Sequence, residues 1–118
     1  MAKITPLEFS GSTDGRMIKV VATATAGTLI HTAVTGTSDY DRIFLYAVNS
    51  DTSDRKLTIE WGGTTSPDDL IEETIKTEDG SINLVDGWVL QNGLVVRAFA
   101  ASANVVMIGG YVLRYDAA

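Results

Sequence analysis

Residues 57–61 read Leu-Thr-Ile-Glu-Trp, and the alternation of apolar and polar side chains in this stretch decides the fold class. Successive side chains of a β-strand point to opposite faces, so Leu57, Ile59 and Trp61 would share one face. Similar short runs, rich in valine, isoleucine, threonine and aromatic residues, recur between glycines along the whole chain. Residues of these types favour strands, so the sequence predicts an all-β protein.

The apolar runs give the expected strands. These lie at residues 18–24, 28–34, 42–49, 56–61, 70–75, 82–85, 88–91, 94–100 and 105–115. About eight short strands in a chain of 118 residues are typical of a two-sheet sandwich or a small barrel. The sequence therefore predicts a single-domain β-sandwich, with a jelly roll favoured.

Paired turn residues mark the second half of the chain. Asp86-Gly87 and Asn92-Gly93 each lie between apolar runs, and both dipeptides readily adopt the positive φ angles of a two-residue hairpin. They predict a meander from residue 82 to residue 100. Gly109-Gly110, in the middle of the last strand, indicates instead a bulge or a close approach of two backbones.

Two segments allow more than one interpretation. Residues 66–76 begin with Ser-Pro-Asp-Asp, which is typical of a helix start; the all-β surroundings favour a strand, with one short helix as the alternative. Residues 1–16 contain Pro6 and a run of glycine and small polar residues from Ser10 to Gly15, so we separate them, as an extended N-terminal arm, from a β-sandwich domain of residues 17–118. This arm either lies on its own core as an edge strand or plug, or docks on an adjacent subunit.

The strand expected at residues 42–48 is apolar on both faces. Ile43, Leu45 and Ala47 alternate with Phe44, Tyr46 and Val48, which is typical of a strand that is central in a packed sheet or covered by a neighbouring subunit. Arginines that interrupt apolar strands fit either a solvent-exposed edge or a salt bridge between subunits. The candidate interface residues are Ile4, Leu7, Phe9, Phe44, Tyr46, Arg97 and Arg114.

Composition argues against several classes of partner. Fifteen acidic against nine basic residues give a net charge of −6, so we expect neither nucleic acid nor a membrane as partner. The sequence starts without the charged head, apolar run and cleavage site of a secretory signal, and no apolar run approaches the length of a membrane span. These features predict a protein synthesised in a cytoplasm.

Residues for catalysis or metal binding are scarce. The chain has no cysteine, one histidine, His31, and no Gly-x-Ser-x-Gly motif, so we expect no enzyme activity. We also expect no cofactor and no metal, although the polar turn that holds Asp51 and Asp54 is of a kind that can bind calcium. Trp61 and Trp88 could stack on sugar rings, but they are also suited to the core of a small sandwich.

The turn and core residues of the second half carry a resemblance. They comprise residues 57–63, 70–75, Gly80 and residues 85–87, 90–100, 104–105 and 110–112. In this pattern, which spans residues 57–114, the chain resembles small β-sandwich virion proteins that are encoded among the structural genes of tailed double-stranded DNA bacteriophages.

The resemblance implies a structural role. Proteins of this type include jelly-roll cement, or decoration, proteins that lie as trimers on the icosahedral capsid and bridge neighbouring capsomers. By this resemblance we expect a capsid decoration protein on the virion surface, with the major capsid protein as partner and a homo-oligomer, a trimer being favoured. The alternatives are a minor component of the head–tail junction or tail, and a carbohydrate-binding module of a tail or host-adhesion structure.

Overall fold

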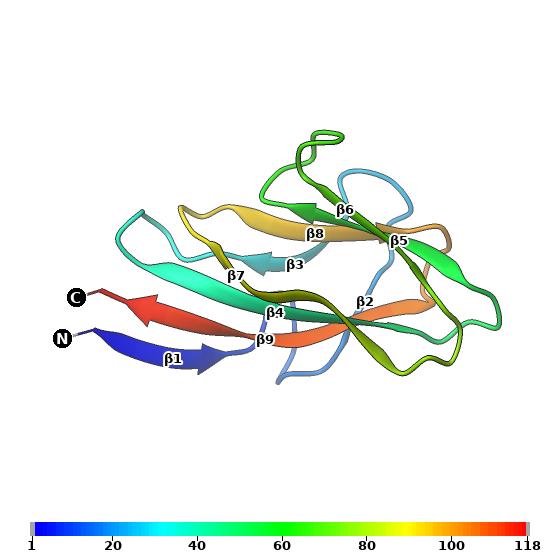
Figure 1. The fold of residues 1–118 in the computed structure, drawn as a ribbon, viewed down its shortest axis with the longest axis horizontal. Helices are drawn as coiled ribbons and strands as arrows, with labels where there is room; N and C mark the ends of the chain where they lie inside the picture. The colour runs from blue at the N-terminus through cyan, green and yellow to red at the C-terminus, as the bar shows by residue number, and fades with distance from the viewer. Residues whose placement is uncertain (1, 118) are drawn as a thin grey trace.

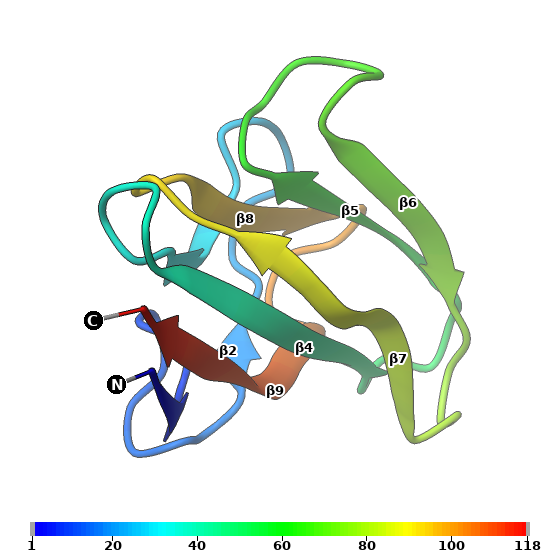
Figure 2. The same ribbon diagram turned by 60° about the vertical axis from the view of Figure 1, so that its left-hand side comes forward.

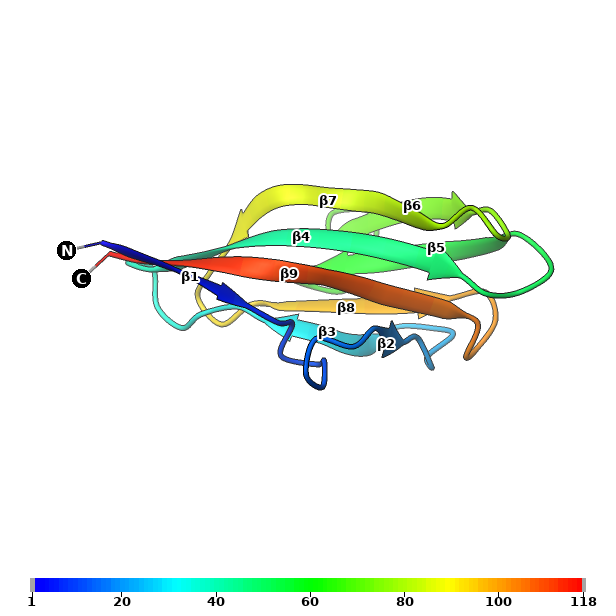
Figure 3. The same cartoon turned by 90° about the horizontal axis from the view of Figure 1, so that it is seen from below.

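A computed structural model describes residues 2–117, which form two packed layers of antiparallel strands (Figure 1). Sheet A contains, in order, β1 (Lys3–Leu7), β9 (Val106–Asp116), β4 (Tyr40–Asn49) and β7 (Ser81–Leu90), with β2 (Ile18–Lys19) also paired to β9. Sheet B contains, in order, β3 (Thr28–Thr32), β8 (Val95–Ala100), β5 (Arg55–Trp61) and β6 (Leu70–Ile75). Figure 3 shows β4 and β9 in one layer and β3 and β8 in the other. The predicted β-sandwich is confirmed.

The strand pairing is that of a jelly roll. Antiparallel ladders join β2 to β9, β3 to β8, β4 to β7 and β5 to β6. The chain is therefore one long two-stranded ribbon that folds over itself, so that successive pairs fall alternately into sheet A and sheet B. Further ladders between β4 and β9 and between β5 and β8 close each sheet, and Figure 2 shows β4 lying between β9 and β7.

The hydrophobic core lies between the sheets and follows the alternation seen in the sequence. On β4, every second side chain from Ile43 to Ala47 is completely buried, and on β5 Leu57 and Ile59 are equally enclosed. Phe9 joins the same cluster from the segment that follows β1. None of the described residues, 2–117, belongs to a helix that is long and apolar enough to cross a membrane.

The hairpin predicted at Asp86-Gly87 is wrong, because β7 runs straight through it. The register against β4 shifts between Ile43 and Phe44, so Gly87 forms a bulge inside one strand. Gly87 has a φ of 83°, and a Cβ there would lie 2.5 Å from the guanidinium of Arg42 and 3.0 Å from the Phe44 ring. The glycine thus makes room for two side chains of the neighbouring strand, which no local pattern reveals.

Asn92-Gly93 is a turn, as predicted, but it does not form a hairpin. Both residues have positive φ, at 63° and 69°. The turn connects β7 in sheet A with β8 in sheet B, so the expected meander from residue 82 to residue 100 does not exist. A turn signal reports local backbone shape, and that shape serves equally well where the chain crosses between two sheets.

The first residues belong to the sandwich itself. Antiparallel pairing of β1 with β9 runs from Lys3 opposite Asp116 to Leu7 opposite Val112, and Phe9 is only 2% exposed. Of the two alternatives for residues 1–16, the structure has the edge strand anchored on its own core. Residues 3–9 thus supply an edge strand and a core side chain of the same sandwich.

The segment with helix-start residues forms a turn followed by a strand. The Asp69 carboxylate accepts a hydrogen bond from the Thr65 amide at 3.0 Å, and the Asp69 amide donates to the Thr65 carbonyl at 2.9 Å. β6 begins directly afterwards and pairs with β5 from Leu70 to Ile75. The strand prediction is confirmed, and the helix-like signals of this segment stabilise a tight loop.

Candidate interaction surface

The outer side of sheet A is apolar across most of its width. The apolar side chains that point away from the core on β1, β4, β7 and β9, together with Arg42, form what we call the aromatic face. Its residues are Ile4, Pro6, Tyr40, Arg42, Phe44, Tyr46, Val48, Val89, Met107, Tyr111, Leu113 and Tyr115. Outward polar side chains border it, namely Lys19 on β2 and Ser81, Asn83 and Asp86 on β7. Ile4, Val89 and Tyr111 are the most open large apolar members, at 55%, 52% and 43% exposure.

Two aromatic pairs order this face. Tyr40 stacks on Tyr115 with a centroid distance of 4.7 Å and an interplanar angle of 10°, and Phe44 stacks on Tyr111 at 4.7 Å and 12°. Each pair joins residues directly opposite one another on β4 and β9. Stacking of this kind contributes roughly 0.5–1.5 kcal/mol per pair beyond burial, so these rings are held in place before any partner arrives.

Arg42 is also held flat against the face. Its Nε donates to the Gly87 carbonyl at 3.0 Å, and its guanidinium carbon lies 5.6 Å from the centroid of the Phe44 ring. The bulge at Gly87 provides the space for this arrangement. Asp86 on β7 is exposed and lies opposite Phe44, so it places a negative charge on the strand beside β4.

Gly109 and Gly110 shape the same surface. The side chain of Met17 lies over Gly109, 3.4 Å from the position of a Cβ there. A Cβ on Gly110, whose φ is 141°, would overlap the Phe44 carbonyl oxygen and press on the Phe9 ring. The close approach of two backbones predicted at this dipeptide is confirmed, and it brings β4 and β9 together beneath the aromatic pairs.

A buried polar network lies on the inner side of the same strands. Asp41 is fully buried and accepts four hydrogen bonds. Two come from Arg114, through Nε at 2.8 Å and Nη2 at 3.0 Å, one from His31 Nε2 at 2.8 Å and one from the Val34 amide at 3.1 Å. The network joins β3 of sheet B to β4 and β9 of sheet A, so it ties the two layers together.

Both ring nitrogens of His31 are occupied by structural bonds. Nδ1 accepts a hydrogen bond from the Ser10 amide at 3.0 Å, so Nε2 carries the proton that is donated to Asp41. The Ser10 hydroxyl oxygen instead accepts from the Thr32 amide at 2.7 Å. Serine, histidine and aspartate thus meet here without a ring nitrogen that could take a proton from the serine hydroxyl.

The pKa values in this network follow from burial and charge. Burial lowers the pKa of His31 below its ordinary value, and this effect outweighs the opposing influence of Asp41. Burial alone would raise the pKa of Asp41, but the hydrogen bonds from Arg114 and His31 hold that pKa below its usual range. A neutral histidine and an ionised aspartate paired with Arg114 are therefore the stable forms.

Sheet B offers a different surface. Glu60 on β5 is completely buried on the outer side of the sheet, beneath the loop that leads into β3. Its carboxylate accepts a hydrogen bond from the Gly27 amide at 2.6 Å and another from the Thr25 hydroxyl. Arg97, which lies opposite Glu60 on β8, points to the same side. This loop covers part of the sheet and leaves no continuous apolar face there.

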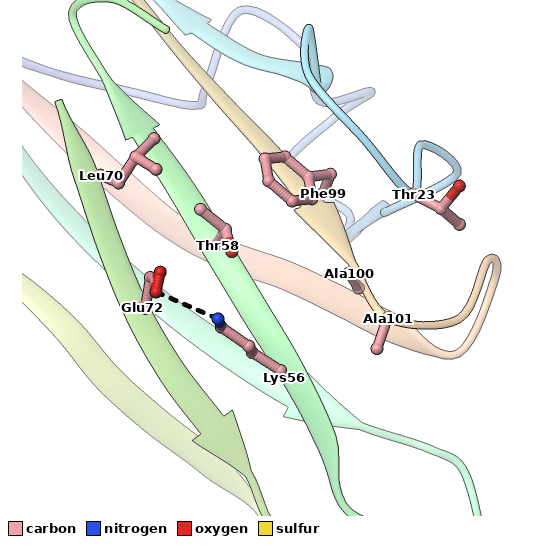
Figure 4. A pocket seen from close by; sticks show the side chains of 8 residues that line it. All are labelled: Thr23, Lys56, Thr58, Leu70, Glu72, Phe99, Ala100 and Ala101. Atoms are coloured by element: carbon pink, nitrogen blue, oxygen red, sulfur yellow. Dashed lines mark ion pairs between the residues drawn. The ribbon is translucent and has the colours of Figure 1, made fainter. Parts of the chain in front are cut away.

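The concavity drawn in Figure 4 lies on the exposed part of that sheet. It has a volume of about 160 Å³ and is lined by Phe99, Leu70, Thr58 and the ion pair between Lys56 and Glu72, whose charged atoms are 3.0 Å apart. Ligand pockets for small molecules usually measure about 300–1,000 Å³. A hollow of this size, bridged by an exposed ion pair, carries no ligand assignment.

The structure separates the candidate interface residues into groups. Ile4, Phe44 and Tyr46 lie on the aromatic face, whereas Leu7 and Phe9 pack into the core. The two arginines lie elsewhere: Arg97 is on sheet B, and Arg114 points inward to Asp41 in the same chain. The alternation in residues 105–115 indicated a second apolar face for β9 as well, but the candidate residues chosen from the sequence include no apolar residue of β9 and none of β7.

The other candidate side chains have partners within the chain. Trp88 is half exposed and packs edge-on against Trp61 at 5.6 Å, away from the aromatic face. In the polar turn of the kind that can bind calcium, Asp51 pairs with Arg55 at 2.6 Å and Asp54 accepts a hydrogen bond from the Thr77 amide at 3.1 Å. Within residues 2–117, no three acidic or histidine side chains gather into a group that could hold a metal ion.

Comparison of the chain with protein-family models, with curated proteins and with solved structures finds no significant match in any of the three.

Proposed function

We propose that this protein is a non-enzymatic structural protein that functions as part of an assembly in which the aromatic face is buried. The observation that carries the proposal is the extent of this face. Four strands of sheet A, spaced about 4.8 Å apart and up to about 33 Å long, cover roughly 600 Å². The apolar part of this face is comparable to the largest apolar patch of a typical soluble protein, and such a patch is often an interaction site.

The order of the face supports the same proposal. Its aromatic rings are already stacked and Arg42 is already bonded to the Gly87 carbonyl. Binding to such a surface costs less side-chain entropy than binding that must first order mobile side chains on the surface. A preorganised adhesive surface suits a building block better than a transient contact.

The finer proposal rests on the resemblance to virion proteins of tailed bacteriophages. We place the protein on the capsid surface as a decoration protein that bridges and stabilises subunits of the major capsid protein, as a homo-oligomer for which the resemblance favours a trimer. A chain without cysteine and with a rigid jelly-roll fold is well suited to this role.

Binding to purified shells tests the function. Wild-type protein is mixed with capsids that lack it, and the bound copies are counted after co-sedimentation. A decoration protein binds in many symmetry-related copies and raises the temperature at which the shell releases DNA; a head–tail or tail component binds in far fewer copies. A wild-type protein that does not bind shells overturns the proposed decoration function.

A matched pair of variants connects binding to the aromatic face. Tyr111 and Leu94 are almost equally exposed, at 43% and 44%, but only Tyr111 lies on the face. We expect Tyr111→Ser to weaken shell binding and Leu94→Ser to leave it unchanged. Equal losses in the two variants would show that the face is not the adhesive surface.

A further inference from the structure

We propose that the aromatic face binds the same face of a second copy of this chain, so that two jelly rolls stack with their A sheets together. This inference rests on the proposed function, because it names the partner of the surface that the function requires. It commits to a contact between copies, and shells then bind the pair. A face variant that separates the two copies therefore also weakens shell binding, because two linked contacts bind more tightly than one.

Charge selects a second copy as the partner. The chain carries a net charge of −6, so two copies repel each other over most of their surfaces. Among the described residues that point outward from sheet A, the charged side chains are those of Lys19, Arg42 and Asp86, which sum to one positive charge. Two copies therefore meet with least repulsion through this face.

The chemistry of the face also matches itself. A partner with a strongly charged surface would have to leave its charges unpaired against stacked tyrosines, which is costly. A mainly apolar and aromatic surface with few charges is the best complement, and the surface of this kind that the chain itself provides is the aromatic face. Sheets that pack face to face lie about 10 Å apart, at angles that follow from their twist.

The area suffices for a stable pair. Each face covers about 600 Å², so two copies remove roughly 1,200 Å² from solvent, which is the lower limit for specific protein–protein interfaces. A contact between identical patches is isologous and closes as a dimer. It is therefore distinct from the three-fold contact that the resemblance implies.

Three of the strands at the sheet edges carry features that hinder pairing there, which favours the face as the route of association. β1 carries Pro6, and β7 is irregular at two points opposite β4. On β6 the acids Glu72 and Glu73 are exposed. Proline, bulges and charges of this kind prevent edge-to-edge association of sheets.

Sedimentation of the full-length chain over a range of protein concentrations tests the proposal. We expect a dimer in the micromolar range or below. Tyr111→Asp and Val89→Glu each place a negative charge on the face and should raise the dimer dissociation constant at least tenfold, whereas Leu94→Asp should not. Val89 is 52% exposed on an edge strand, so this second variant keeps the test valid if Tyr111→Asp does not fold.

Three results would overturn the inference: a monomer at about 100 µM, a trimer as the smallest assembly, or a dimer that neither face variant weakens. Shell binding separates this inference from the proposed function. A monomeric protein that binds shells retains the function without the paired face, whereas a dimer that binds no shell retains the paired face without the function.

Discussion

The stability of this protein between pH 7 and pH 5 is predicted to depend on one side chain. His31 is the single histidine of the chain, so no other side chain has an ordinary pKa in this range. It is 2% exposed, and its Nδ1 accepts the Ser10 amide. Protonation of Nδ1 would place its N–H against the N–H of Ser10, so that two donors face each other. It would also put a positive charge on a buried ring.

The sign and size of the effect follow from proton linkage. Burial lowers the pKa of His31 in the folded protein, so the unfolded chain binds the proton first as pH falls below about 6.5. The free energy of unfolding is then largest above that pH and declines as pH falls toward the folded pKa. The slope can reach about 1.4 kcal/mol per pH unit, which is the limit for one proton.

Urea unfolding at half-unit steps from pH 7.5 to pH 5 measures this slope. In His31→Gln the free energy of unfolding is lower throughout, because the bonds to Asp41 and Ser10 are weakened, but its dependence on pH in this range disappears. A flat wild-type profile, or a slope that persists in His31→Gln, would refute the argument. Below about pH 4.5 both proteins lose stability together, because the Asp41 pKa lies below that of an unfolded aspartate.

Three further substitutions test how the core and the close contacts are built, each by urea unfolding. Phe9→Ala should cost about 3–5 kcal/mol and speed hydrogen exchange of the β1 amides; unchanged exchange would mean that Phe9 does not anchor that strand. Gly110→Ala should cost more than about 2 kcal/mol, because its Cβ would overlap the Phe44 carbonyl; Gly109→Ala, next to a flexible side chain, is the control and should cost clearly less. Glu60→Ala should cost about 1–3 kcal/mol because it leaves a buried amide of the covering loop unpaired, and a neutral result would show that this loop is not held by the carboxylate.

The fold class was predictable because it depends on patterns within single strands. Alternation in residues 57–61 and the doubly apolar stretch at residues 42–48 both correspond to observed strands, β5 and the central β4. Such patterns are local, since they follow from the two faces of a pleated strand. The jelly-roll topology was reached from strand number and length, which leave few other arrangements for a chain of this size.

Turns were predicted less well because one dipeptide serves several purposes. Asp86-Gly87 meets the requirements of a hairpin, yet it forms a bulge where Arg42 and Phe44 cross the neighbouring strand. The deciding contact joins residues more than forty positions apart, so nothing near the dipeptide distinguishes the two outcomes. The partner of Arg114 could not be predicted for the same reason, because Asp41 lies 73 residues away in the chain.

The candidate site was predictable in kind and only partly in residues. The pattern of β4 alone indicated an apolar outer face, and Phe44 and Tyr46 lie on it as expected. Which strands extend that face depends on sheet order. β9 and β7 flank β4 in the sheet, and this placement adds Tyr111 and Val89 to the face. The sequence pattern of one strand does not show which strands lie beside it.

The inward side chains of β4 determine the stability of the fold, whereas its outward side chains determine association with a partner. The inward side chains, such as Ile43 and Leu45, are fully buried and suffice to fill the core between the sheets. One face of an antiparallel sheet can be polar and solvated at no cost to folding, so the sandwich itself does not require an apolar outer face. Substitution of Ile43 should therefore lower stability and association together, whereas substitution of Tyr111 by serine should lower association and change stability only by the loss of its stacking on Phe44. We expect this difference if the outer face of β4 is buried in an assembly. Equal loss of stability on substitution of Ile43 and of Tyr111 would contradict it.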